Sequence, residues 1–327
     1  MRHAVLALSL LATPAVAGVE EAITDHALSA TDRFAEAAGA LAETAGNDCT
    51  AEALRPAWND AFDAWLGLAH LRFGPLETGS RALSIAFWPD PRGMIPRTVS
   101  GIVADADPIV ETPEGFAEVS IAARGLFAME RLLYAEDLSA YAAGDYACTL
   151  AWAQAQDLAR MGNAIAEDWE AFAETIRTAG EAGNDTFLSE REPRQAFYTA
   201  LTTGMSFVID QRLGRPLGSF DDPRPDRAEA RLSGRALRNV TLSVEALRDL
   251  ARALAPGEIP QTDAAFARAL TTAGRIDAGD FSGVSDPRQR IVVEALQQQL
   301  VEARENAANE IGVPLGVSAG FNASDGD

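Results

Sequence analysis

The segment from Gly125 to Tyr134, GLFAMERLLY, places a single carboxylate, Glu130, within an otherwise apolar stretch. If this segment is a helix, the side chains three and four positions away share the face of Glu130. These neighbours are all apolar or aromatic: Leu126, Phe127, Leu133 and Tyr134. Burying a lone ionised carboxylate costs several kcal/mol, so such a group should be paired, protonated or bound to a ligand. The pattern therefore predicts a buried Glu130 that has a specific partner.

Two interpretations of this carboxylate are open. In the first, an arginine from a neighbouring helix forms a structural ion pair with it, because a planar guanidinium suits a carboxylate. The candidates are Arg72, Arg81, Arg124, Arg231 and Arg235. In the second, the carboxylate and nearby arginines line a pocket that holds a small ligand. In both we expect an ionised Glu130, hydrogen-bonded to an arginine from outside its own helix.

A second polar cluster lies in the segment EARLSGR, from Glu229 to Arg235. Ser233 stands between Arg231 and Arg235, which makes a polar cluster in this segment. The alternative is that residues 229–235 are only the charged start of a helix.

The residue inventory excludes several kinds of catalysis. All 27 basic residues are arginine, so there is no lysine for a Schiff base or a lysine general base. After residue 17 the histidines are His26 and His70, too few for a three-histidine zinc site. His70 could approach Glu130 from another helix, but a surface or capped histidine is the more common case. We therefore assign no catalytic residue.

The first 17 residues resemble a cleaved signal peptide. Arg2 precedes an apolar run that ends in Ala15-Val16-Ala17, which predicts cleavage after Ala17 and export to the periplasm. The formal charge of −21 disfavours nucleic acid and anionic membrane surfaces as partners, and no later run is long enough to insert in a membrane. In an oxidising compartment Cys49 and Cys148 predict one disulfide, although two buried thiols are the alternative.

Apolar residues at helical spacing recur along most of the chain. We expect an all-α protein with helices at about 19–45, 52–72, 113–136, 146–179, 192–213, 226–254, 261–273 and 287–311. Clustered proline and glycine between residues 72 and 97 indicate a long irregular loop. This organisation predicts two four-helix bundles, residues 18–183 and 184–327, after a signal peptide at 1–17.

Several motifs in order resemble the imelysin-like family of exported bacterial proteins linked to iron uptake. The segments are GLFAMERLLY, AWNDAFDAWLGLAHLRFGPL, FWPDPRGMIP, ALTTGMSFVIDQRLGRPLG, AEARLSGRALRNVTLSVEALRDL and GVPLGVSAGFNASDGD, which together span nearly the whole chain after residue 17. The resemblance implies two helical bundles with a site where they meet, and partners among periplasmic iron-uptake proteins. The resemblance also places the segment 229–235 opposite the motif helix, so our candidate ligand-binding set is Glu130, Arg124, Arg231, Ser233 and Arg235. It also implies a GxHxxE motif whose His and Glu could hold iron or another metal ion.

The chain departs from that motif at one position. Gly125 and Glu130 match, but Phe127 stands where the family has histidine, and a phenyl ring cannot bind a metal. Glu130 then remains as the one motif residue able to bind a metal. The preferred interpretation is a non-enzymatic binding or accessory protein in iron uptake that holds a small ligand or metal ion between the bundles. The alternative is a metallopeptidase of the imelysin type, which would need about three protein ligands.

Overall fold

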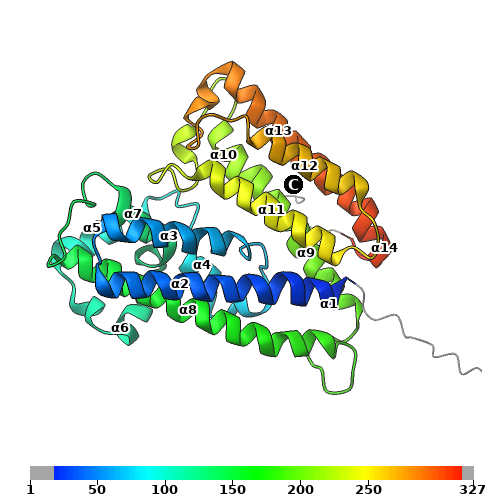
Figure 1. The fold of residues 1–327 in the computed structure, drawn as a ribbon, viewed down its shortest axis with the longest axis horizontal. Helices are drawn as coiled ribbons and strands as arrows, with labels where there is room; N and C mark the ends of the chain where they lie inside the picture. Colours follow the sequence, from blue (N-terminus) through cyan, green and yellow to red (C-terminus); the bar gives the residue numbers. More distant parts are fainter. Residues whose placement is uncertain (1–17, 319–327) are drawn as a thin grey trace, which may run out of the picture.

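The protein consists of two groups of helices that lie against each other (Figure 1). The structure, a computed structural model, describes residues 18–318. The first group contains α1 (Val19–Glu21), the π-helical η1 (Ala22–Leu28), α2 (Ser29–Asn47), α3 (Ala51–Leu66), α4 (Arg81–Ile85), α5 (Met94–Asp105), α6 (Pro113–Ala117), α7 (Gly125–Tyr134) and α8 (Tyr146–Arg177). The second contains α9 (Arg191–Ser206), the π-helical η6 (Phe207–Leu213), α10 (Gly214–Leu217), α11 (Ala236–Leu254), α12 (Pro260–Ala273), α13 (Pro287–Ala307), the π-helical η9 (Ala308–Gly312) and α14 (Val313–Leu315).

The all-α prediction is confirmed, since residues 18–318 contain helices and connecting segments without a strand. The second group has four long helical stretches, while the first has three, which end in α2, α3 and α8, together with the shorter α5 and α7. The arrangement as two four-helix bundles stays a prediction. The division of the chain at residue 183 remains a prediction, and the signal peptide at 1–17 lies outside the described residues. None of the helices between residues 18 and 318 is both long and apolar enough to cross a membrane.

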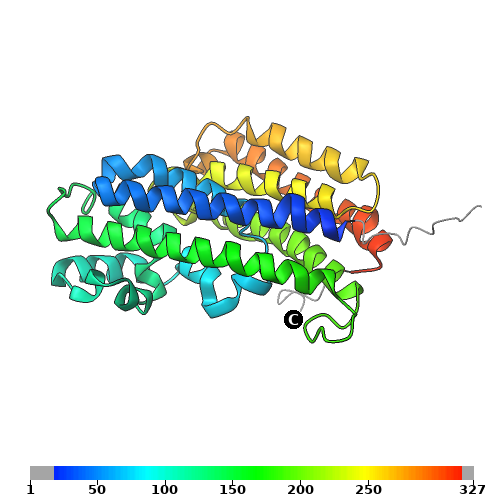
Figure 2. The ribbon, with the colours of Figure 1, turned by 60° about the horizontal axis from the view of Figure 1, so that its bottom comes forward.

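The first group is built around the long pair α2 and α8, with α3 on the other side of α2 (Figure 2). Its core follows the predicted apolar spacing, with Phe34, Leu41, Trp58, Phe62 and Trp65 almost fully buried. Cys49 and Cys148 form the predicted disulfide, with their Cα atoms 5.1 Å apart. It joins the turn before α3 to the first turn of α8 and closes 99 residues of chain, which the chain-entropy argument values at about 4 to 5 kcal/mol.

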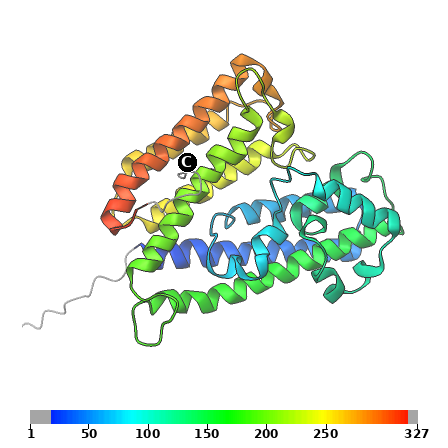
Figure 3. The same ribbon diagram turned by 180° about the vertical axis from the view of Figure 1, so that it is seen from behind.

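Two predicted helices are shorter than expected. The helix expected from 113 to 136 is broken into α6, a 3₁₀ turn at Ile121–Ala123, and α7, because the chain turns at Gly125. The connecting segment between α3 and α7 carries further short helices and faces the viewer in Figure 3. The helix expected from 226 begins only at Ala236, and the preceding residues form turns with positive φ at Ala230 and Gly234.

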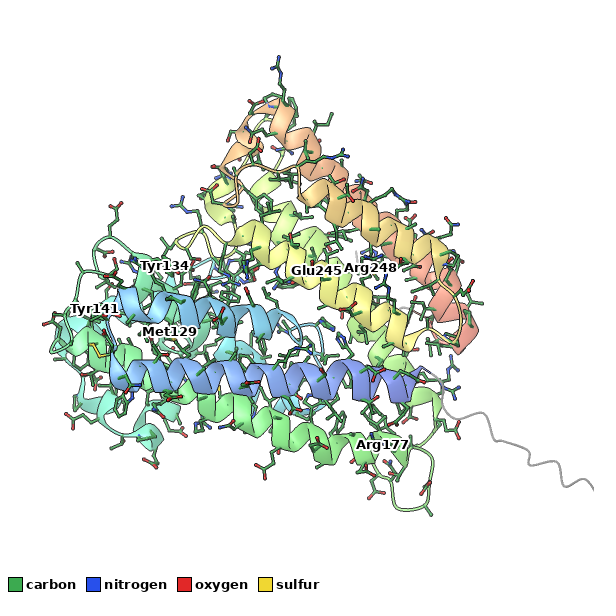
Figure 4. All side chains as sticks on the ribbon, in the orientation of Figure 1. Met129, Tyr134, Tyr141, Arg177, Glu245 and Arg248 are labelled. Atoms are coloured by element: carbon green, nitrogen blue, oxygen red, sulfur yellow. A yellow bond between two sulfur atoms is a disulfide. The ribbon has the colours of Figure 1, made fainter. Side chains whose placement is uncertain are left out.

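The two groups meet along α11, which packs against α1, η1 and α3, while α9 packs against α1. Figure 4 marks Glu245 and Arg248 on α11, and Met129 and Tyr134 on α7 within the first group. The irregular segment that precedes α11 contacts α7 through Ser233 and α3 through Arg235.

Candidate functional site

Gly125 begins α7 at a point where the chain must turn sharply. Its φ is 72°, in the left-handed region, and a Cβ here would lie 2.2 Å from the carbonyl oxygen of Ser84. A side chain at this position would clash with the backbone of residues 84 and 85. The turn explains the glycine of the motif and sets the direction in which α7 leaves the loop.

Helix α3 holds α7 in place through hydrogen bonds to main-chain carbonyl groups. The indole N–H of Trp58 donates to the carbonyl oxygen of Leu126 at 3.1 Å, and the Arg55 guanidinium donates to that of Leu133 at 2.8 Å. Both acceptors lie on the helix that carries Glu130, one turn on either side of it. The carboxylate is thus presented from a rigid element.

Glu130 is 5% exposed and receives two hydrogen bonds from Ser233 of the second group. The Ser233 main-chain N–H lies 2.9 Å from Oε1 of Glu130, and the Ser233 hydroxyl lies 2.6 Å from the same oxygen. The turn geometry with positive φ at Ala230 and Gly234 points both donors at the carboxylate. One carboxyl group therefore links α7 to a segment 103 residues away in the sequence.

Burial raises the pKa of Glu130 to about 7. The two hydrogen bonds from Ser233 and the positive charge of Arg235 act in the opposite direction, while the negative charge of Glu229 raises the pKa further. Near neutral pH this carboxyl is thus divided between its protonated and ionised forms. The expectation of a buried Glu130 is confirmed, while the expectation of an ionised one stays a prediction.

The predicted arginine partner of Glu130 is also wrong, because the donors that reach it among the described residues both belong to Ser233. Arg124 instead forms a bidentate pair with Asp157 of α8. Arg231 is exposed to solvent. Arg235 influences Glu130 through its charge, but its hydrogen bonds go to the side chains of Asn59, Asp63 and Asn239. Of the candidate set, the structure brings Glu130 and Ser233 into contact, with Arg235 nearby; whether they bind a ligand stays a prediction.

A buried polar network extends from Arg235 into the second group. Asn239 accepts from Arg235 at 2.7 Å and donates to Glu229 at 2.9 Å. Glu229 accepts from Arg212 at 2.6 Å, and Arg212 donates to Ser243 at 2.9 Å. Arg235, the N-cap residue of α11, and Asn239 and Ser243 on α11 are spaced four residues apart. A polar stripe on the buried face of this helix was the available sequence signal. We identified only its first member from the sequence.

The two histidines form a buried pair that sequence reasoning missed. Their Nε2 atoms are 2.8 Å apart, so one ring donates and the other accepts, and both are neutral. Burial, then the charge of Arg33, lowers the pKa of His26 to about 4. Burial, then the charges of His26 and Arg212, lowers the pKa of His70 well below its usual value. His70 is 7% exposed and contacts His26, so the surface or capped interpretation is wrong.

The residues around Glu130 do not fit a resident metal ion. Phe127 packs edge-on against Phe62, with ring centroids 5.4 Å apart, and supplies no metal-binding atom. Oε1 of Glu130 already accepts two hydrogen bonds. Between residues 18 and 318, no group of three or more His, Cys, Asp or Glu side chains is arranged to hold a metal. The implied His and Glu metal pair is therefore replaced by an aromatic contact and a serine.

Comparisons with known proteins agree with the fold. A family model described as Imelysin, and named as a peptidase family, matches residues 22–307. Among solved structures, an imelysin-like protein from Psychrobacter arcticum 273-4 is similar with a TM-score of 0.74 and 18% identity, covering 93% of this chain and 96% of that one. A protein described as a putative iron-regulated protein A precursor, from Parabacteroides distasonis ATCC 8503, has a TM-score of 0.67 and 11% identity, covering 90% of this chain and 94% of that one. Among curated proteins there is no match.

Proposed function

The chain belongs to the imelysin family, and from this we propose that it is an exported binding or accessory protein in iron uptake that does not cleave peptides. The observation that carries the proposal is the junction at Glu130, where a buried carboxyl with a raised pKa meets Ser233 of the other helical group. Such a group can exchange a proton, or a hydrogen-bond partner, at little cost near neutral pH.

Three further observations support this function. The structural neighbour from Parabacteroides distasonis carries an iron-regulated name. The disulfide between Cys49 and Cys148 suits a protein that works in the periplasm. The acidic charge of −21 suits contact with cationic cargo or partners, so iron would act as cargo held weakly by carboxylates and not as a resident cofactor.

The peptidase alternative comes from the family name, and it requires a metal site with a general base. A zinc hydrolase needs about three protein ligands and a base, and the surroundings of Glu130 supply an aromatic ring and a serine instead. The family's motif histidine would place an imidazole beside this carboxylate. In this chain Phe127 occupies that position, and the imidazoles of His26 and His70 contact each other instead.

The test has one biochemical and one cellular arm. We expect the protein purified without chelators to leave casein intact with or without added zinc, and ferric or ferrous ions to bind weakly in calorimetry. In the source bacterium, deletion of the gene should slow growth under iron limitation, with restoration by the wild type and impairment by Glu130→Gln. Casein cleavage that EDTA and Glu130→Gln both abolish would overturn the proposal in favour of the peptidase.

A further inference from the structure

A cavity of about 350 Å³ lies between the two helical groups, at the far end of the buried network from Glu130. Its apolar wall consists of Trp65, Leu66, Trp88, Phe207, Val208 and Leu247. These side chains come from α3, the long connecting loop, η6 and α11, so both groups contribute. At roughly 30 Å³ each, the share of one water molecule in the liquid, the space suits about twelve non-hydrogen atoms.

Most of the polar groups that line this cavity already have partners. Arg212 and Glu229 neutralise each other in a buried pair, and Ser243 accepts from Arg212. His70 is held neutral by burial and by its bond to His26. These four groups add no net charge to the cavity.

Arg72 is the exception. It lines the same cavity and is exposed, which places it at the mouth. Its guanidinium donates to the carbonyl oxygen of Ala69 at 3.0 Å, and among residues 18–318 it forms no ion pair. The negative charges of Glu229 and Glu77 act on it from a distance, without a direct contact. An apolar chamber with one guanidinium outside any ion pair at its edge is suited to a ligand with an apolar body and one negative charge.

We propose that this cavity binds an amphipathic monocarboxylate, with its apolar body of about eight carbons against Trp65 and Trp88 and its carboxylate on Arg72. This goes beyond the proposed function, because it assigns a second site and a ligand class that contains no metal. The acidic exterior does not oppose it, since the groups that line the cavity have a net positive charge.

Octanoate is the probe, and octylammonium is its charge-reversed control. Trp65 and Trp88 both line the cavity, so intrinsic tryptophan fluorescence of the intact protein should change in a saturable manner with octanoate at pH 7. Arg72→Gln should weaken binding roughly tenfold, the loss expected for one charge-assisted hydrogen bond, and Arg72→Lys should restore most of it. Arg231→Gln removes the same charge from an exposed position and should leave the affinity unchanged.

A blocking variant tests the location independently. Ala69 lines the cavity and is half-buried, so Ala69→Phe should fill the space and abolish the saturable signal, with folding checked by circular dichroism. The proposal is overturned if octylammonium binds as tightly as octanoate, if Arg72→Gln binds like the wild type, or if octanoate gives no saturable signal up to about 10 mM, an affinity too weak for a built site. Because neither probe contains a metal, these outcomes are independent of any role in iron uptake.

Discussion

Two buried polar contacts differ in how burial affects them: one joins Glu130 to Ser233, and the other joins His26 to His70. Burial moves the pKa of the glutamate and the pKa of the histidine in opposite directions. Burial raises the pKa of Glu130 to about 7 and lowers the pKa of His26 to about 4. Histidine is the usual group to change charge near neutral pH. Among residues 18–318 the buried histidines stay neutral, and burial brings the pKa of the Glu130 carboxyl close to physiological pH. A proton-linked function would therefore act at the junction between the helical groups.

Of the substitutions at these two buried contacts, removal of the Glu130 carboxyl should change the free energy of unfolding most. At pH 5, where Glu130 is mostly protonated, Glu130→Ala should lower the free energy of unfolding by about 4 kcal/mol, because it leaves a cavity and strands the two Ser233 donors. Urea unfolding measures this loss, and Glu136→Ala, an exposed change two residues beyond the same helix, is the matched control. A loss below about 1 kcal/mol would mean that the junction does not depend on this carboxyl.

The pH dependence of stability should separate the two sites. Between pH 4.5 and 7 the folded chain keeps a proton on Glu130 that the unfolded chain has lost, so this group's contribution to stability falls as pH rises. The Glu130→Gln variant has no titrating group here, so its stability does not fall in this way as pH rises. The free energy of unfolding of the variant, relative to the wild type, should therefore rise by about 3 kcal/mol between pH 4.5 and 7. A flat difference across the window would show that Glu130 titrates normally.

The histidine pair should show the opposite slope. Between pH 6.5 and 4 the unfolded chain binds a proton at His26 that the folded chain does not, so stability is lost as pH falls through this window. His26→Gln can keep a hydrogen bond to His70 without titrating. Its stability relative to the wild type should therefore improve by about 3 kcal/mol as pH falls from 6.5 to 4. An unchanged difference would contradict a buried neutral His26.

A smaller effect is expected from the serine side of the junction. Ser233→Ala removes the hydroxyl donor but keeps the main-chain N–H, so at pH 8 it should cost about 2 kcal/mol, as for a hydrogen bond to a charged group. The same change should raise the pKa of Glu130 further, because that hydrogen bond favours the ionised form. Ser233→Thr is the comparison that keeps the donor. A lowered pKa in Ser233→Ala would contradict the assigned hydrogen bond.

The smallest effect is expected at the exposed arginine of the same segment. Arg231→Ala should change the free energy of unfolding by less than about 0.5 kcal/mol, because this side chain is exposed to solvent. A loss comparable to that of Ser233→Ala would restore Arg231 to the candidate site.

Helical periodicity predicted the fold class and the burial of Glu130, because these depend on local spacing and on residue types. The disulfide was predicted separately, from one pair of cysteines in a chain expected to be exported. It could not supply the partner of Glu130, since Ser233 reaches the carboxyl from a turn whose positive φ at Ala230 has no local signature. The histidine pair was missed for a related reason: the rings are 44 residues apart and meet only when η1 packs beside the chain that follows α3. The replacement at Phe127 was visible in the sequence, but its aromatic contact with Phe62 depends on tertiary packing.

The titration of Glu130 itself tests the central claim most directly. Carbon-13 NMR of protein labelled at the glutamate side-chain carboxyl carbon, followed from about pH 5 to 9, gives one midpoint for each resolved group. The resonance that is missing in Glu130→Gln identifies the residue. We predict a midpoint near pH 7, shifted upward by burial at the junction with Ser233. A midpoint near the ordinary value of 4.5 would contradict the account.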